Sequence, residues 1–196
     1  MRINKYLAKC GIGSRRKCDE FISSGKIKVD GKKVTDFSFN VNDDSYVQFN
    51  NKLVNQLENV IYMLNKPRGY ICTKDDNLGR KIIYDLLPDK VDLFSIGRLD
   101  YDTTGILLVT NDGDLCYKLT HPKFNIDKKY YAFTDKKLSN SDILKIKKGI
   151  KLDNELLKAD IKFLENIKNG YFWDIVLTEG KNREIKRIFT YFDIRV

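Results

Sequence analysis

The chain has 196 residues, 42% of them hydrophobic, and a formal net charge of +9. This composition excludes a disordered chain, and the apolar runs, such as Gly105–Val109, are far shorter than the roughly 20 residues that span a bilayer. The four cysteines have seven or more residues between them and His121 is the single histidine, so C-x-x-C pairs, catalytic triads and histidine-rich metal sites are poor candidates.

Basic residues gather at the start of the chain. Residues 1–34 hold ten lysines and arginines against three acids, so most of the net charge lies there. A cluster this dense can attract a polyanion, but it can equally be a solvated face of a lysine-rich protein, and charge alone leaves the two interpretations about even. The ten residues are Arg2, Lys5, Lys9, Arg15, Arg16, Lys17, Lys26, Lys28, Lys32 and Lys33.

The first 50 residues predict two short helices and a hairpin. Ile3, Tyr6 and Leu7 recur at helical spacing, and Ser14 stands where an N-cap would begin a second helix. Residues 27–34 alternate around Asp30-Gly31, which is a strong signal for a two-residue hairpin turn. We expect a compact module at 1–50, with Arg15, Arg16 and Lys17 at the phosphate-attracting start of the second helix.

Residues 51–59 are polar and without a clear period, so we expect a linker there and a second domain at 60–196. The second domain alternates short strands with helices, which predicts an α+β fold with a mainly antiparallel, mixed sheet flanked by helices. Ser139 with Asp142 resembles a capping box before the helix predicted at 141–148. The predicted strands are 61–64, 106–109, 130–133 and 171–177, and the predicted helices are 82–87, 115–119, 141–148 and 183–192.

The segment 97–105 reads GRLDYDTTG and runs directly into the apolar residues 106–109. A loop that sets a basic residue beside a carboxylate and is braced by a buried strand can hold a reactive aspartate rigidly. For an isolated aspartate, an ordinary solvated turn is the commoner explanation.

The wider sequence resembles the pseudouridine synthases that act on single ribosomal uridines, whose motif reads G-R-L-D-x-x-T-x-G-L-L-L-x-T-N-D-G. The match from Gly97 to Gly113 is nearly complete, with Ile106 as a conservative departure and Val109 at an unspecified position. Agreement continues at residues 65–69 (NKPRG), 128–130 (KKY) and 179–187 (EGKNREIKR), and residues 2–49 resemble an S4-type RNA-binding domain. The resemblance covers essentially the whole chain.

The resemblance implies a role for particular residues. Asp100 is then the catalyst, by attack on the ribose anomeric carbon or by proton abstraction; Lys186 is its cationic partner; and Tyr130 packs on the target uracil. Neither mode needs a metal or a cofactor. Substrate contacts are expected at Lys66, Arg98, Arg183 and Arg187, and contacts to RNA at Arg2, Lys5, Arg15, Arg16, Lys17, Lys26 and Lys28.

From pattern alone, simpler interpretations exist for several of these residues. Arg183, Lys186 and Arg187 would form a solvated helix face, and Tyr130 a cross-strand core aromatic whose neighbour Tyr131 faces the other way. Asp100-x-Asp102-x-Thr104 also spells the nucleophile motif of magnesium-dependent phosphohydrolases, although Gly97-Arg98 interrupts the strand which that class needs. A third class is a ribosome-binding protein without activity.

The expected partner is ribosomal RNA, either mature or in an assembly intermediate of the subunit, bound by a cytoplasmic monomer. Tyr101-Asp102, residues 120–122 (THP) and Asn182-Arg183 favour 23S RNA, whereas Lys186 also occurs among enzymes of the small subunit, so 16S RNA stays open. The chain ends at Val196, where the family normally continues through another strand. We therefore expect either that the protein continues past this residue or that its sheet has a shortened edge.

Overall fold

The computed structural model describes residues 1–88 and 92–196, which form two compact units, 1–116 and 117–196. The boundary falls inside helix α3 (Gly113–Thr120). In the described residues, no helix combines the length and apolar character needed to cross a membrane.

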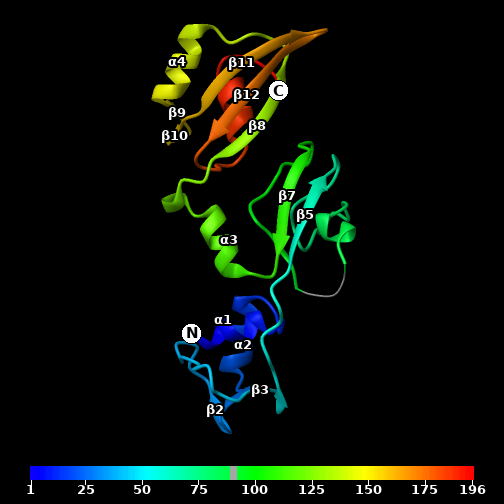
Figure 1. The fold of residues 1–196 in the computed structure, drawn as a ribbon, viewed down its shortest axis with the longest axis vertical. Helices are drawn as coiled ribbons and strands as arrows, with labels where there is room; N and C mark the ends of the chain where they lie inside the picture. Colours follow the sequence, from blue (N-terminus) through cyan, green and yellow to red (C-terminus); the bar gives the residue numbers. More distant parts are fainter. Residues whose placement is uncertain (89–91) are drawn as a thin grey trace. The chain divides into compact units, whose positions relative to one another are not determined.

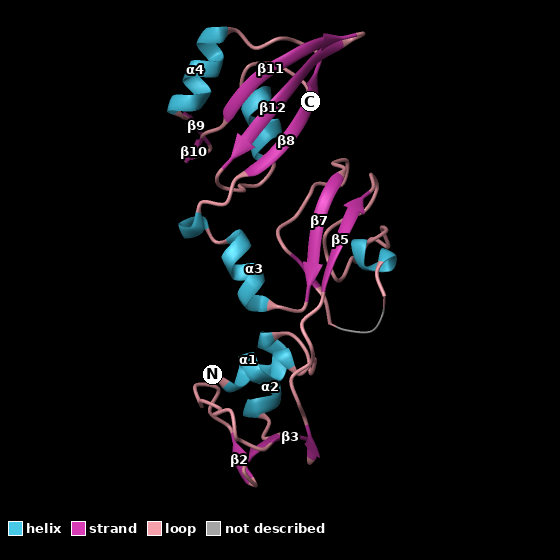
Figure 2. Cartoon of the chain, viewed as in Figure 1, coloured by secondary structure: helices cyan, strands magenta, loops and turns pink. Residues whose placement is uncertain are grey.

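The first unit begins with a helical pair packed on a small antiparallel sheet (Figure 2). Its sheet has the order β2-β1-β3-β4, and Ile3, Leu7, Ile22 and Ile27 have no exposed surface in the core between helices and sheet. The helix-helix-hairpin prediction is therefore confirmed. The elements are α1 (Ile3–Lys9), α2 (Arg15–Ser23), β1 (Ile27–Val29), β2 (Lys32–Val34), β3 (Val47–Phe49) and β4 (Lys52–Leu53). Strand β4 lies within the segment 51–59 that we expected to be a linker.

Local signals explain these elements. The Ser14 side chain accepts a hydrogen bond from the Lys17 N–H, which caps α2 as predicted. Among the described residues, four hairpins turn on two residues each, and in three of them both loop residues have positive φ, which Gly, Asn and Asp tolerate best. The three loops are Asp30-Gly31, Asn50-Asn51 and Asp153-Asn154.

A second sheet of the first unit has the order β5-β7-β6 and is antiparallel. It comprises β5 (Ile61–Lys66), β6 (Phe94–Ser95) and β7 (Gly105–Thr110), and the single turn η1 (Ile83–Leu86) stands where a helix at 82–87 was predicted. Leu107 and Val109 are buried against Ile83 and Leu93, whereas Met63 and Ile106 on the other face are 74% and 70% exposed. One face of this sheet thus forms a core directly behind the loop that precedes β7.

The second unit is a three-stranded antiparallel sheet, β11-β12-β8, covered by α4 and α5 (Figure 1). Trp173 is fully buried in its core, and its indole N–H donates to the Thr134 hydroxyl at 2.7 Å. The Ser139–Asp142 capping box is confirmed, as are the strands predicted at 130–133 and 171–177 and the helices predicted at 115–119, 141–148 and 183–192. The elements are η2 (Pro122–Phe124), β8 (Lys128–Thr134), α4 (Asn140–Lys148), β9 (Ile150–Leu152), β10 (Glu155–Leu157), β11 (Asp160–Ile167), β12 (Gly170–Leu177) and α5 (Glu184–Thr190). The α+β class is confirmed, with several small sheets where we expected a single one.

Thiol reactivity should follow burial. Burial raises the pKa of Cys10 to about 12 and that of Cys18 to about 11, so at pH 8 roughly one molecule in a thousand or fewer carries either thiolate. We expect iodoacetamide at pH 8 to modify the half-buried Cys72 and Cys116 first, and Cys10 and Cys18 only after denaturation. Peptide mass spectrometry of the alkylated protein measures this order, and early modification of Cys18 in the folded protein would contradict it.

Candidate active site

The loop that carries Asp100 joins β6 to β7 in the first unit. Asp100 itself is half-buried, and its backbone carbonyl accepts from the Thr103 N–H at 3.1 Å, which closes a turn. Arg98, two residues earlier, is exposed, as a contact to RNA phosphate requires. The predicted motif thus forms a turn directly before the buried strand β7.

Lys66, at the end of β5, lies beneath this turn and has no exposed surface. Its ammonium donates to the carbonyls of Asp100 (2.9 Å), Thr103 (2.9 Å) and Pro67 (3.0 Å). Burial lowers the pKa of Lys66, and the charges of Cys72, Asp102 and Asp100 oppose that shift. In this conformation the side chain supports the loop and has no exposed surface, and the predicted substrate contact at Lys66 stays a prediction.

The rest of segment 66–72 completes the support. The Gly69 N–H donates to the Tyr101 carbonyl at 2.8 Å, the Arg68 Nε to the Asp102 carbonyl at 3.0 Å, and the Cys72 thiol to the Leu99 carbonyl at 3.3 Å. Together with the bonds from Lys66, each backbone carbonyl from residue 99 to 103 accepts a hydrogen bond from residues 66–72. Backbone conformation around Asp100 is therefore fixed by bonds that do not involve its side chain. Sequence reasoning matched residues 65–69 to the family without finding this role.

Tyr130 lies on β8 of the second unit, opposite Ile175 of β12. It is half-buried and packs against the core, whereas Tyr131 is 61% exposed and stacks on Phe172 with ring centroids 5.5 Å apart. The expected alternation of the two tyrosines is confirmed. Packing of Tyr130 on a uracil stays a prediction.

The basic residues predicted near the end of the chain lie at the start of α5, also in the second unit. Arg183 is exposed and precedes the helix with a left-handed backbone (φ 47°), a conformation that is uncommon for arginine and is found more often at functional sites. Lys186 is half-buried on the first turns of α5. The Arg187 guanidinium already bonds the Glu155 carboxylate at 2.5 Å, so RNA phosphate would have to compete with Glu155 for it. Because Asp100 and Lys186 belong to different units, their pairing stays a prediction.

The basic residues of the N-terminal module are placed unequally. Arg2, Arg15, Arg16, Lys17 and Lys26 are exposed, Lys28 is half-buried, and Lys17 also pairs with Glu20 at 2.6 Å. Lys5 differs, because its ammonium bonds the Asp114 carboxylate at 2.5 Å and Lys9 bonds the same carboxylate at 3.2 Å. The pKa of Asp114 is lowered, mainly by the hydrogen bond from Lys5. RNA phosphate would have to compete with Asp114 for Lys5, which the sequence did not indicate.

Comparison with known proteins adds independent findings. Residues 60–191 match the family model of RNA pseudouridylate synthases, and residues 1–45 match that of S4 domains. The chain is 39% identical to a ribosomal large subunit pseudouridine synthase B from Bacillus subtilis, over 96% of this chain and 79% of that protein. It is 30% identical to a protein of the same description from Haemophilus influenzae, over 100% of this chain and 57% of that protein. A crystal structure of a pseudouridylate synthase superposes with a TM-score of 0.66 at 27% identity, over 100% of this chain and 85% of the other.

Proposed function

Since the chain belongs to the RNA pseudouridylate synthase family and carries an S4 domain, we propose that it isomerises one uridine of 23S ribosomal RNA to pseudouridine. The observation that carries the choice of RNA is the 39% identity to the Bacillus subtilis large-subunit synthase along nearly the whole chain. Family membership makes the protein an isomerase, so neither the phosphohydrolase interpretation of Asp100-x-Asp102-x-Thr104 nor that of a binding protein without activity is retained.

In the proposed mechanism, Asp100 starts the reaction on the flipped uridine. The uracil leaves C1′ of the ribose, turns, and rejoins through C5, whose proton passes to solvent while N1 gains one, so the nucleotide keeps its composition. The braced turn supports this role, because a carboxylate must be held at one position to act on one bond. Lys186 would offset the charge of Asp100, Tyr130 would pack on the detached base, and the exposed Arg98 and Arg183 would contact phosphates. Covalent attack and proton abstraction by Asp100 both fit.

The S4 domain would supply affinity for RNA in the cytoplasm, where the monomeric enzyme meets 23S RNA. Its first contacts are expected at Arg15 and Arg16, which are exposed on the capped first turn of α2. There, side-chain charge and the N-terminal end of the helix dipole both favour phosphate.

Neutralising these two arginines should weaken RNA binding without slowing the chemical step. We expect the double variant Arg15→Gln, Arg16→Gln to raise the Kd for 23S RNA fragments about tenfold near 0.1 M salt, and to lower the magnitude of the slope of log Kd against log salt by about 1 to 2. Activity at saturating RNA should stay within about twofold. The control is Lys32→Gln, Lys33→Gln, which removes the same charge from exposed positions of β2. Equal loss of affinity in both double variants would contradict a specific role for the start of α2.

Chemical mapping of pseudouridine in ribosomal RNA tests the proposed function directly. RNA would be compared from cells with the gene, without it, and with the wild-type gene restored. We expect one pseudouridine in 23S RNA to disappear with the gene and to return on complementation. Loss of a site in 16S RNA would overturn the choice of subunit, and an unchanged map of both RNAs would overturn the proposed function.

A further inference from the structure

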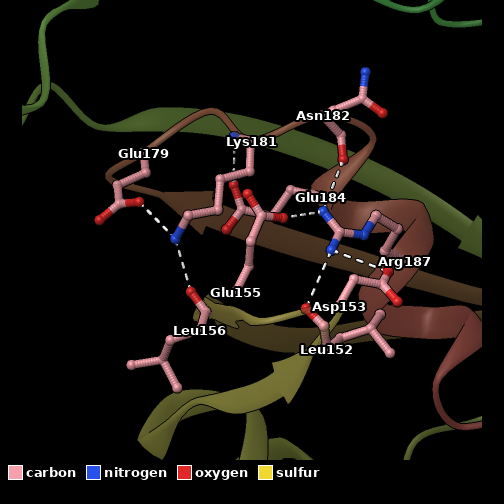
Figure 3. A network of polar contacts seen from close by, with 9 residues as sticks. All are labelled: Leu152, Asp153, Glu155, Leu156, Glu179, Lys181, Asn182, Glu184 and Arg187. Atoms are coloured by element: carbon pink, nitrogen blue, oxygen red, sulfur yellow. Dashed lines mark hydrogen bonds and ion pairs between the residues drawn. The ribbon is translucent and has the colours of Figure 1, made fainter.

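A polar network ties the segment 179–187 to the hairpin β9–β10 within the second unit (Figure 3). At one end, the Arg187 guanidinium reaches the hairpin through Glu155 at 2.5 Å and through Asp153 and the Leu152 carbonyl, both at 3.4 Å. Asp153 lies in the two-residue turn of the hairpin, where φ is 49°. The hairpin thus presents two carboxylates and a carbonyl to one guanidinium.

The other end of the segment is held by Lys181. Its ammonium donates to the Leu156 carbonyl of β10 at 2.7 Å and pairs with Glu179 at 2.7 Å. The Lys181 N–H donates to the carboxylate of Glu184 at 2.9 Å, and Glu184 is only 4% exposed. Figure 3 shows both basic side chains reaching toward the hairpin.

Between these two anchors lie Arg183 and Lys186. Arg183 keeps its left-handed backbone (φ 47°) only if the surrounding chain enforces it, because an arginine has no intrinsic preference for that conformation. The Arg187 guanidinium also donates to the Asn182 carbonyl at 3.4 Å, which links the start of α5 to the residue before Arg183. The network therefore fixes both sides of the turn that contains Arg183.

The contacts of Arg187 are not equal in strength. The Arg187 side chain is 20% exposed and Glu155 43%, whereas Asp153 is 76% exposed and its longer contact is screened by water. The pKa of Arg187 is raised, mainly by its hydrogen bond to Glu155. Glu155 is therefore the partner whose removal should release the guanidinium.

We propose that Arg187 and Glu155 are positioning residues for the isomerisation, which hold the 179–186 segment so that Arg183 and Lys186 are presented to the RNA, and that Arg187 itself does not bind substrate. This inference rests on the proposed function for its kinetic consequence. Its structural content, a segment ordered by an ion pair to the hairpin, does not depend on that function.

The test compares E155Q, R187Q and R187K with wild type. Tritium release from uridine labelled at C5, in ribosomal RNA from cells lacking the gene, gives kcat; filter binding gives Kd; and circular dichroism confirms that each variant is folded. We expect E155Q and R187Q each to lower kcat about 10- to 100-fold with Kd within about threefold, because misplacement of a site by about 1 Å costs rate rather than affinity. R187K should recover to within about threefold of wild type. The double variant should be no slower than R187Q, because both changes break one pair.

The matched control is K147M, which removes the exposed ion pair of Lys147 with Asp160 in the same unit, 2.9 Å long. It should leave kcat and Kd unchanged. A tenfold rise in Kd for R187Q with wild-type kcat for E155Q would overturn the inference and make Arg187 a phosphate contact. Should R187Q fail to fold, E155Q and R187K still decide between the two results.

Amide hydrogen exchange separates this inference from the proposed function. In E155Q we expect the amides of residues 181–186 to exchange about tenfold faster than in wild type, while K147M leaves them unchanged. Unchanged exchange in E155Q overturns the inference. Absence of tritium release from wild type overturns only the proposed function, because the exchange measurement needs no RNA.

Discussion

Replacing Asp100 by Asn is expected to lower pseudouridine formation by about 10⁴-fold or more while the Kd for RNA stays within about threefold. The amide has nearly the shape of the carboxylate but can neither attack the ribose nor accept a proton. The turn should survive, because the bonds from Lys66 and from the Thr103 N–H go to the backbone carbonyl of residue 100. Tritium release from uridine labelled at C5 measures the rate, and filter binding measures affinity.

Asp102→Asn is the matched control for this experiment. Asp102 lies in the same turn, and the bond from Arg68 reaches its backbone carbonyl, so the substitution makes the same chemical change two residues away. We expect Asp102→Asn to keep the rate within about tenfold of wild type. A rate for Asp100→Asn within tenfold of wild type would remove Asp100 from the mechanism.

Replacing Lys66 by Met is expected to damage both stability and turnover. Met has a similar length but offers no N–H, so the carbonyls of Pro67 and Thr103 lose this donor, and that of Asp100 keeps only the bond from the Thr103 N–H. At about 1 to 3 kcal/mol for each of the two groups left unsatisfied, the free energy of unfolding should fall by about 2 kcal/mol or more, and Tm by about 4 to 8 °C. We expect kcat to fall about 100-fold with Kd within about threefold, since the turn rather than the RNA surface is disturbed.

Thermal unfolding, and kcat measured well below the lowered Tm, separate the two effects. Lys52→Met, which changes an exposed lysine of β4, should alter neither quantity.

The pH dependence of stability gives a further check on Lys66. Because burial lowers the pKa of Lys66 below its ordinary 10.5, the unfolded chain holds this proton more tightly, and the folded state gains stability as pH rises toward 10.5. That gain should be absent from Lys66→Met. Wild-type Tm and kcat in the variant would refute the supporting role.

The sequence predicted those features that nearby residues determine. Ser14 and Ser139 cap helices through residues three positions later, and Asp30-Gly31 closes a hairpin between its immediate neighbours. Catalytic candidates followed from a motif that is contiguous along the chain. Two-residue strand β4 was missed because so short an element carries no periodicity.

The features that distant residues determine could not be predicted. A lysine at the end of an apolar strand is normally exposed, and the acceptors that bury Lys66 stand 34 and 37 positions later. The partner of Arg187 likewise stands 32 positions earlier, so a helical pattern at 183–187 indicated only a solvated face. Asp114, which binds Lys5 109 positions away, carried no signal for the same reason.

The two-residue loops Asp30-Gly31, Asn50-Asn51 and Asp153-Asn154 have a kinetic consequence. Each joins strands that are adjacent along the chain, and such hairpins close in about 1 to 10 μs. Strands β5 and β7, by contrast, are separated in the sequence by residues 67–104, and strands that lie far apart along the chain pair slowly. During folding we therefore expect the N-terminal module and the β9–β10 hairpin to acquire protected amides first. The carbonyls of residues 100 and 103 can accept hydrogen bonds from Lys66 only after β5 and β7 have paired, so the turn that holds Asp100 should be among the last parts of the protein to form.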